Sequence, residues 1–173
     1  TGIIVGTTNR VFRTTNGGAT WNEQVNTTGF YLMGVSFIDE NNGITVGYYG
    51  HIMKTTDGGE NWITANSNTV YVLLNVNFID ANHAIAVGAS GMIVKSDDGG
   101  NNWSEITNGA GYALYGLVFT SPTNGIAVGD VGTIFRTTDG GNTWDQQTSG
   151  TGNYLLSVSF KDANNGIAVG KSG

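Results

Sequence analysis

The sequence predicts an all-β protein, and three observations support this prediction. Glycine supplies 28 of the 173 residues, cysteine none and proline one, and only 12% of the residues are charged. A chain so poor in Lys and Glu is not typical of long, solvated helices, and no segment shows a sustained apolar period of 3.6 residues. The third observation is an internal repeat. Four tryptophans, each 41 residues after the last, mark it: Trp21, Trp62, Trp103 and Trp144.

Other positions follow the same period without a gap. Leucine, phenylalanine and a Val-Gly pair recur at Leu32, Leu73, Leu114 and Leu155, at Phe37, Phe78, Phe119 and Phe160, and at Val5, Val46, Val87, Val128 and Val169. A period of 20 to 50 residues is typical of repeat architectures in which each unit is one supersecondary element. The structure predicted for one 41-residue unit therefore applies to every unit.

The first half of a unit predicts two strands. Residues 31–38 (YLMGVSFI) form an apolar run rich in β-formers, and the polar group 39–42 (DENN) predicts a turn after it. Residues 43–47 (GITVG) then predict a short second strand. This strand is apolar on both faces, which indicates a sheet that is covered on both sides.

The second half predicts two more strands. A tight connection at 48–50 leads to a third strand at 51–55 (HIMKT), and a glycine turn at 56–59 leads to a fourth at 61–65 (NWITA). Four short antiparallel strands in about 40 residues are the size of one propeller blade. We therefore predict a β-propeller of four-stranded antiparallel blades, with about four blades in this chain.

The period divides the chain into one propeller segment. It consists of a partial blade at 1–29, whole blades at 30–70, 71–111 and 112–152, and a partial blade at 153–173. Both ends carry a copy of the second strand, which is one strand too many for a simple four-bladed ring. An open arc of blades would expose two apolar faces, which isolated soluble proteins avoid. We expect either that further blades of a longer chain close the ring or that copies of this chain assemble.

A short motif joins the third and fourth strands in every repeat. A hydroxyl residue is followed by Asp or Asn, Gly and Trp at fixed spacing: Thr14, Asn16, Gly18 and Trp21; Thr55, Asp57, Gly59 and Trp62; Ser96, Asp98, Gly100 and Trp103; Thr137, Asp139, Gly141 and Trp144. A carboxylate here can accept backbone N–H bonds, and glycine permits positive φ. Calcium binding is the alternative, but each turn offers at most two carboxylates. We expect structural turns and no metal.

This motif resembles the Asp-box, or BNR repeat, of sialidases, sortilin-like receptors and many bacterial propellers. The pattern GIAVGDVGTIFRTTDGGNTW is most similar to the repeats of the photosystem II assembly- or stability-factor family of seven-bladed propellers. The resemblance covers essentially the whole chain. It implies a partial propeller with an assembly role and no catalysis.

Variation among the repeats indicates where a ligand could bind. If residues 31–38 lie nearest the axis, the Asp-box turns and the DENN-type turns lie at one end of the blades. The other end then carries two sets of connections, at 27–30, 67–71, 108–112 and 148–153 and at 47–51, 88–92 and 129–133. The second end varies most between repeats. We predict a shallow site there for a peptide loop or a glycan, formed by Tyr48, Tyr49, His51, Tyr71, Tyr112 and Asp130. The alternative is neutral variation of exposed loop residues.

Four basic residues each precede an Asp-box: Arg13, Lys54, Lys95 and Arg136. One interpretation is a ring of positive charge that binds anions. The other is a strand-end side chain that lies over Trp or pairs with a nearby carboxylate.

Several functions are excluded by composition. A sialidase would need an arginine cluster, a tyrosine nucleophile and an acidic partner, whereas this chain has three arginines, two of them at repeat positions. We expect no enzyme activity and no cofactor. The net charge of −6 disfavours nucleic acid as a partner, and no apolar run reaches the ~18 residues of a membrane span.

Three functional hypotheses remain. The first is a non-catalytic scaffold for protein interaction or assembly, whose partner is a protein or further blades from a longer chain or a second copy. The second is a carbohydrate-binding, lectin-like propeller that binds a glycan. The third is a fragment of an Asp-box glycosidase. Low charge with abundant Thr, Asn and Gly leads us to expect an extracellular, cell-surface or periplasmic location.

Overall fold

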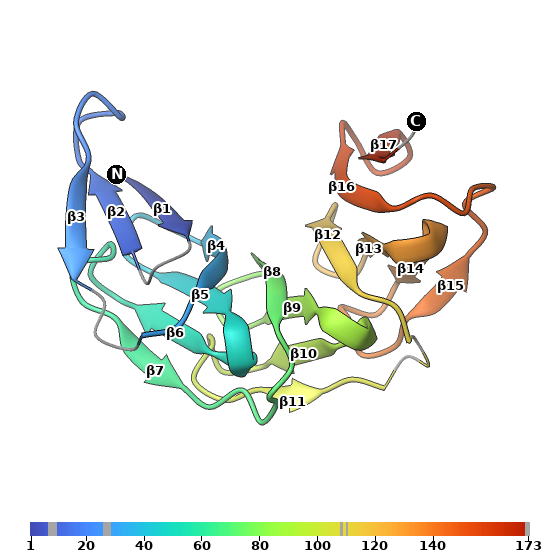
Figure 1. Cartoon of the computed structure of the whole chain (residues 1–173), viewed down its shortest axis with the longest axis horizontal. Helices are drawn as coiled ribbons and strands as arrows, with labels where there is room; N and C mark the ends of the chain where they lie inside the picture. Colours follow the sequence, from blue (N-terminus) through green and yellow to red (C-terminus); the bar gives the residue numbers. More distant parts are fainter. Residues whose placement is uncertain (7–9, 26–28, 108, 110, 172–173) are drawn as a thin grey trace.

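A computed structural model of the chain describes residues 1–6, 10–25, 29–107, 109 and 111–171 (Figure 1). These described residues form seventeen strands in five antiparallel sheets, and their only helical elements are three short 3-10 turns. No helix in this part of the chain is both long and apolar enough to cross a membrane.

Each sheet is built from consecutive strands in chain order. The first contains β1 (Gly2–Gly6), β2 (Arg10–Thr14) and β3 (Asn22–Val25). The second contains β4 (Leu32–Phe37), β5 (Gly43–Gly47), β6 (Ile52–Thr55) and β7 (Ile63–Ala65). The third contains β8 (Leu73–Phe78), β9 (Ala84–Gly88), β10 (Ile93–Ser96) and β11 (Ser104–Glu105). The fourth contains β12 (Leu114–Phe119), β13 (Gly125–Gly129), β14 (Ile134–Thr137) and β15 (Asp145–Gln147), and the fifth β16 (Leu155–Phe160) and β17 (Gly166–Gly170).

The sheets follow one another around an open arc, as blades of a propeller (Figure 1). The first strands of successive blades, β4, β8, β12 and β16, contact each other along the inner side. Small residues permit this close approach: a Cβ added to Gly34 or Gly116 would lie 3.1 Å from the Cα of the facing residue, Asn75 or Ser157. The predicted four-stranded antiparallel blade, with 31–38 innermost, is confirmed.

The hydrophobic core lies between blades. Ile44 and Val46 of β5 pack with Leu73 and Trp103 of the next blade, and Ile85 of β9 packs with Trp144 of the blade after that. Every residue of β5 and β9 is buried. The second strand is therefore covered on both faces in these blades, as its apolar sequence predicts.

The fourth strand differs from the prediction. Residues 61–65 were expected to form it, but β7 covers only Ile63–Ala65. The reason is that Asn61 donates its backbone N–H to Asp57 Oδ1 at 2.9 Å and belongs to the turn. The outer strand begins only after this turn is complete.

The two ends of the arc are less covered. Ile4 of β1 is 48% exposed, and Ile167 and Val169 of β17 are 70% and 56% exposed. All five residues of β17 are exposed, in contrast to β5 and β9. The apolar surface that neighbouring blades cover elsewhere is therefore open at both ends of the described arc.

Candidate functional site

The four Asp-box turns share the hydrogen bonds of their hydroxyl residue and of their Asp or Asn, whereas among the described residues the bond from the Trp indole recurs only at Trp103 and Trp144, and Trp62 Nε1 is buried without a partner. In the third blade Ser96 Oγ donates to Asp98 Oδ1 at 2.9 Å and accepts the N–H of Gly100 at 2.8 Å. Asp98 Oδ1 also accepts the N–H of Asn102 at 2.9 Å, and Trp103 Nε1 donates to the Gly100 carbonyl at 3.1 Å. The carboxylate thus links the residue before the turn to the residue after it by hydrogen bonds.

Asn16 supports the same turn without a charge. Its Oδ1 accepts from Thr14 Oγ1 at 2.8 Å and from the N–H of Thr20 at 3.0 Å. The other three turns use Asp, and these hydrogen bonds lower the pKa of Asp57 and Asp98 to about 2, with the backbone N–H bonds from Asn61 and Asn102 contributing most. Within the described residues, no group of three His, Cys, Asp or Glu side chains could hold a metal ion.

Three of the four basic residues before the Asp-boxes, Arg13, Lys54 and Lys95, contact the next blade. Arg13 Nε donates to the Gly58 carbonyl at 2.8 Å, and its guanidinium lies 3.2 Å from Glu60. Lys54 and Lys95 donate to Asn101 and Asn142 of the following blade at 3.2 and 2.7 Å; Lys95 also pairs with Asp97 at 2.9 Å. The Lys95–Asp97 pair lies within one blade and the other contacts join neighbouring blades; together they favour the pairing interpretation over an anion-binding ring.

The opposite end of each blade carries a 3-10 turn: η1 (Tyr48–Gly50), η2 (Ala89–Gly91) and η3 (Asp130–Gly132). We call this the η-turn end. The central residue of each turn has almost the same positive φ, 56° at Tyr49, 57° at Ser90 and 55° at Val131. The first residue of each turn donates its N–H to the carbonyl of Tyr31, Val72 or Ala113 at 2.8–2.9 Å. The backbone here is constant while the side chains vary.

Aromatic side chains gather at the η-turn end of the second blade. Phe30 lies 5.7 Å from Tyr49 and 5.0 Å from His51, and Tyr31 lies 5.3 Å from Tyr48, all between ring centroids. Four of these rings reach the surface: Phe30 is 38% exposed, Tyr31 43%, Tyr48 37% and Tyr49 68%. We call Phe30, Tyr31, Tyr48, Tyr49 and His51 the aromatic cluster.

His51 is the buried member of the aromatic cluster. It is 8% exposed, and its Nε2 is buried with no hydrogen-bond partner. Burial lowers the pKa of His51, because desolvation disfavours the protonated imidazole. The aromatic cluster therefore presents an apolar surface with one unsatisfied polar atom beneath it.

A second buried polar atom without a hydrogen-bond partner lies two blades further on, at Asp130. Burial and a hydrogen bond to the carboxylate of Asp130 raise the pKa of Tyr115, and Asp130 Oδ1 is buried without a partner. Thr133, at the repeat position of His51, is also buried. The η-turn end thus differs chemically from blade to blade.

The structure brings only part of the predicted site together. Tyr48, Tyr49 and His51 form one cluster, whereas Tyr71, Tyr112 and Asp130 lie at the η-turn ends of other blades. Tyr71 and Tyr112 are 47% and 52% exposed. Among the described residues, no hydrogen bond or ring contact joins these three to the aromatic cluster.

The predicted site omitted Phe30 and Tyr31. Phe30 stands at the same repeat position as Tyr71 and Tyr112, so the variation among repeats pointed to it. The sequence indicated Tyr31 less clearly as a site residue, because Tyr31 lies in the apolar run 31–38 that was assigned to the inner strand. Residues 27–28, 108 and 110 of the predicted variable connections lie outside the described residues.

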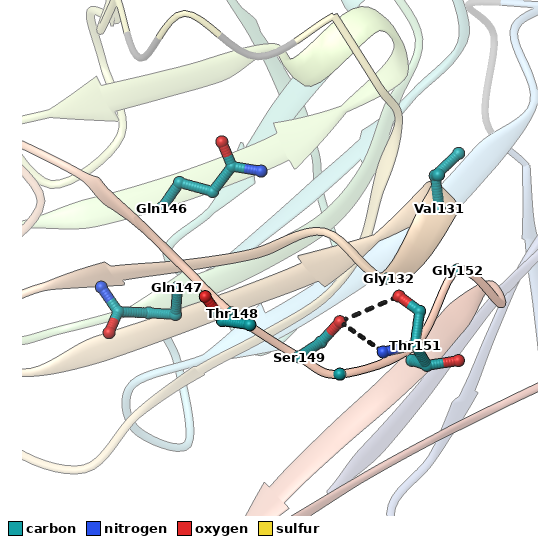
Figure 2. Close-up of a pocket in the computed structure, with 9 residues that line it drawn as sticks. Val131, Gly132, Gln146, Gln147, Thr148, Ser149, Thr151 and Gly152 are labelled. Carbon is teal, nitrogen blue, oxygen red and sulfur yellow. Dashed lines mark hydrogen bonds between the residues drawn. The ribbon is translucent and has the colours of Figure 1, made fainter.

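A shallow surface cavity lies elsewhere at the η-turn end, on the fourth blade. Its volume is about 580 Å³, and it is lined by Val131, Gly132 and residues 146–152. Figure 2 shows Ser149 held in its loop, where its Oγ accepts the Thr151 N–H at 3.3 Å and donates to the Thr151 carbonyl at 3.1 Å. None of the six predicted site residues lines this cavity.

Comparison with known proteins supports the fold assignment. A family model described as the photosynthesis system II assembly factor YCF48 matches residues 24–108, just under half of the chain. No curated protein matches the sequence. The solved structure of YCF48 from Cyanidioschyzon merolae is similar, with a TM-score of 0.75 and 19% identity over 99% of this chain. The chain spans 63% of the length of that protein.

Two further structures are similar at low sequence identity. YCF48 bound to D1 peptide has a TM-score of 0.56 and 17% identity, with 98% of this chain and 86% of that chain covered. A GH74 enzyme from Niastella koreensis has a TM-score of 0.71 and 18% identity, with 99% and 35% covered. The chain is therefore a β-propeller segment of Asp-box (BNR) repeats that resembles the photosystem II assembly-factor propellers.

Proposed function

We propose that this chain is a non-catalytic propeller that binds a protein partner through the aromatic cluster. The observation that supports this is the exposure of four aromatic rings on one blade end whose backbone is fixed by the repeat. Contiguous exposed apolar patches are typical of interaction sites, and Tyr is enriched among the residues that dominate binding energy.

The shape of the aromatic cluster favours a peptide side chain over a flat sugar ring. Tyr31 meets Tyr48 edge to face at 73°, and Phe30 is tilted by 60° and 46° against Tyr49 and His51. Rings tilted against each other do not form one continuous flat face. An apolar or aromatic side chain of an extended peptide can pack edge to face against such rings.

The similarity to YCF48 supports the same class of partner. One of the similar structures is YCF48 bound to D1 peptide, and the family model is that of an assembly factor. We therefore favour an assembly role over the glycan-binding and glycosidase hypotheses. Tyr71, Tyr112 and Asp130 would extend the surface onto the neighbouring blades.

A binding experiment tests this proposal. Peptides selected from a random display library, together with a D1 peptide, are titrated against the 173-residue chain. Replacing Tyr48 and Tyr49 by Ala together should weaken the selected peptides at least about tenfold, the effect of losing a residue that dominates binding. His51 is left intact, because it is buried and its loss would disturb the fold.

Ile63→Ala is the matched control, because Ile63 is 73% exposed on β7, away from the aromatic cluster. It should leave affinity unchanged. Equal affinity of the Tyr48/Tyr49 double variant and the wild type would contradict the proposal. Binding to a glycan array without any peptide binding would instead support the lectin hypothesis.

A further inference from the structure

The basic residues before the Asp-boxes differ in whether a carboxylate neutralises them. At the junction of the first and second blades, the guanidinium of Arg13 lies 3.2 Å from the carboxylate of Glu60. In the third blade, the ammonium group of Lys95 lies 2.9 Å from the carboxylate of Asp97, and only 9% of the Lys95 side chain is exposed. Both cations are therefore paired with an anion of the protein itself.

Lys54, at the junction of the second and third blades, has no such partner. Its Nζ donates to the neutral amide oxygen of Asn101 at 3.2 Å, and among the described residues no carboxylate forms an ion pair with it. Two differences between repeats explain this, because Asn101 stands at the repeat position of Glu60, and Thr56 at that of Asp97. The junction has a described blade on either side of it and lies within the arc (Figure 1). It therefore holds an ammonium group whose charge is not neutralised.

A small pocket lies beside this ammonium group. Its volume is about 190 Å³, and it is lined by Lys54, by Asn101 of the third blade, by residues of the Asp-box turn and by residues 63–65 of β7. This is the volume of about six water molecules in the liquid, and it is smaller than the roughly 300 Å³ at which pockets for drug-sized ligands begin. The pocket has room for one group of side-chain size, and not for an oligosaccharide or a large cofactor.

The outer strand gives this pocket an apolar wall. Ile63 and Ala65 of β7 both line it, and Ile63 is 73% exposed. The repeat position of Ile63 is polar in the other blades, with Asn22, Ser104 and Asp145. An aliphatic group in the pocket would remove part of Ile63 from water, which is favourable. The apolar wall and the unpaired ammonium group thus occur at the same junction.

The pocket also contains one carboxylate, which is already used by the turn. Asp57 Oδ1 accepts from Thr55 Oγ1 at 2.8 Å and from the N–H of Asn61 at 2.9 Å, and Asp57 Oδ2 accepts from Asn61 Nδ2 at 2.8 Å. These bonds lower the pKa of Asp57 to about 2, so it is ionised at neutral pH and repels an anion. A ligand with a single negative charge, bound on the Lys54 side, is therefore favoured over a doubly charged phosphate.

We propose that this pocket binds a carboxylate carried on an aliphatic chain, as presented by the C-terminal residue of a peptide or by a glutamate side chain. The carboxylate accepts from Lys54 Nζ, which has three N–H donors and gives one of them to Asn101. The aliphatic carbons pack against Ile63. The pocket lies at the Asp-box end and the aromatic cluster at the η-turn end, so this inference does not rest on the function proposed above.

The first test is a titration of the isotope-labelled 173-residue chain, followed by NMR, with two small acids. N-acetyl-leucine presents a C-terminal carboxylate, and a glutamate residue capped at both backbone ends presents a side-chain carboxylate. The acid that binds more tightly identifies the source of the carboxylate, and its binding should shift the side-chain amide signals of Asn61 and Asn101. The neutral counterparts, N-acetyl-leucinamide and capped glutamine, should bind at least about tenfold more weakly, the effect of losing a hydrogen bond to a charged group.

Equal affinity of each acid and its amide would overturn the proposal, and so would the absence of binding up to the solubility limit of both acids. A rise in ionic strength should weaken binding of the acids but not of the amides, because salt screens the attraction to Lys54.

Variants at the junction locate the binding. Lys54→Met keeps the aliphatic stem but removes the charge, and it should weaken the acid about tenfold. Asn101→Glu places a carboxylate where Glu60 stands in the second blade, so it should pair with Lys54 and abolish binding without lowering the Tm. Asn101→Gln keeps a neutral amide and is the matched control, which should retain the affinity. Wild-type affinity in Lys54→Met would contradict the proposal.

Two further variants separate this pocket from the aromatic cluster. Ile63→Ala should weaken N-acetyl-leucine several-fold, since it removes the apolar wall, although it is neutral for peptides held by the aromatic cluster. Replacing Tyr48 and Tyr49 by Ala together should leave the affinity for the acid unchanged. Loss of acid binding in that double variant would place the acid at the aromatic cluster and overturn the proposal.

Discussion

The two ends of each blade differ in what is repeated. At the Asp-box end both the side chains and the backbone recur, from Ser96 and Asp98 to Trp103 and their equivalents. At the η-turn end the backbone recurs, with φ between 55° and 57°, while the side chains change from Tyr49 to Ser90 to Val131. The Asp-box end is fixed by side-chain hydrogen bonds, and the η-turn end by main-chain bonds, which leave its side chains free to differ.

The largest expected effect is at the buried tryptophans. Trp103 is 2% exposed, and Trp103→Ala should lower the free energy of unfolding by about 3–5 kcal/mol, because it opens a cavity between blades. Tyr48→Ala at the η-turn end should change it by less than about 0.5 kcal/mol. Urea denaturation followed by fluorescence measures both. Similar losses for the two variants would remove the proposed difference between the ends.

A smaller effect is expected from the hydroxyl that begins the Asp-box. Ser96→Ala leaves the buried N–H of Gly100 without its acceptor and should lower stability by about 1–3 kcal/mol. The matched change at the other end is Ser90→Ala, at an exposed position with the same positive φ as its equivalents. It should be close to neutral, and a loss equal to that of Ser96→Ala would argue against the comparison.

The three Asp-box turns that contain Asp should contribute to stability in a pH-dependent way, whereas the turn that contains Asn16 should not. Asp57, Asp98 and Asp139 have pKa values of about 2 in the folded chain, against an ordinary value of 3.8. At Asp139 burial opposes this shift, and bonds from Thr143 and Thr137 outweigh it. A lowered pKa stabilises the fold above pH 3.8, and this stabilisation disappears as the pH falls from about 4 to about 2.

Two substitutions sharpen this prediction. Asp98→Asn should flatten the loss of stability between pH 4 and pH 2, and Asn16→Asp should steepen it, since it adds a fourth carboxylate to the same hydrogen-bond pattern. Urea midpoints at pH 6, 4, 3 and 2 measure both. An identical pH profile in both variants and the wild type would show that these carboxylates do not control the acid transition.

The smallest effect is expected at the centre of the η-turns. Val131 is a β-branched residue at φ 55°, a conformation that costs L-residues about 1–2 kcal/mol. Val131→Gly should therefore stabilise the chain, by about 0.5–1 kcal/mol after the greater backbone entropy of glycine in the unfolded state is counted. Thermal unfolding should show a higher midpoint; a lower one would mean that the Val131 side chain, and not only the backbone, supports this end.

Much of the fold could be predicted from the sequence because the repeat constrains it. The spacing of Trp21, Trp62, Trp103 and Trp144 fixed the blade length, and the all-apolar second strand indicated neighbours on both faces. The outer strand was predicted too long, since Asn61 continues the alternating pattern of a strand while its backbone N–H is held by Asp57. A local hydrogen bond of this kind has no signature in hydrophobicity.

The candidate site was less predictable. Adjacency in sequence placed Tyr48, Tyr49 and His51 together, but His51 also packs against the ring of Phe30, twenty-one residues earlier in the chain. Pairing of the basic residues was one of two interpretations, but their partners were not identified, because these partners stand in the next repeat. A constant separation of 47 residues links Arg13 to Glu60, Lys54 to Asn101 and Lys95 to Asn142, and a search for polar pairs at that separation would have found them.

These bridges between blades have a consequence for how such a chain could grow. The first three units each carry a basic donor for the unit that follows, and the second, third and fourth units carry the acceptor turn. A tandem duplication of the gene segment would therefore create a new junction that is already complementary, with no compensating mutation needed. Selection could lengthen or shorten the array in whole units and vary the η-turn side chains independently of this process.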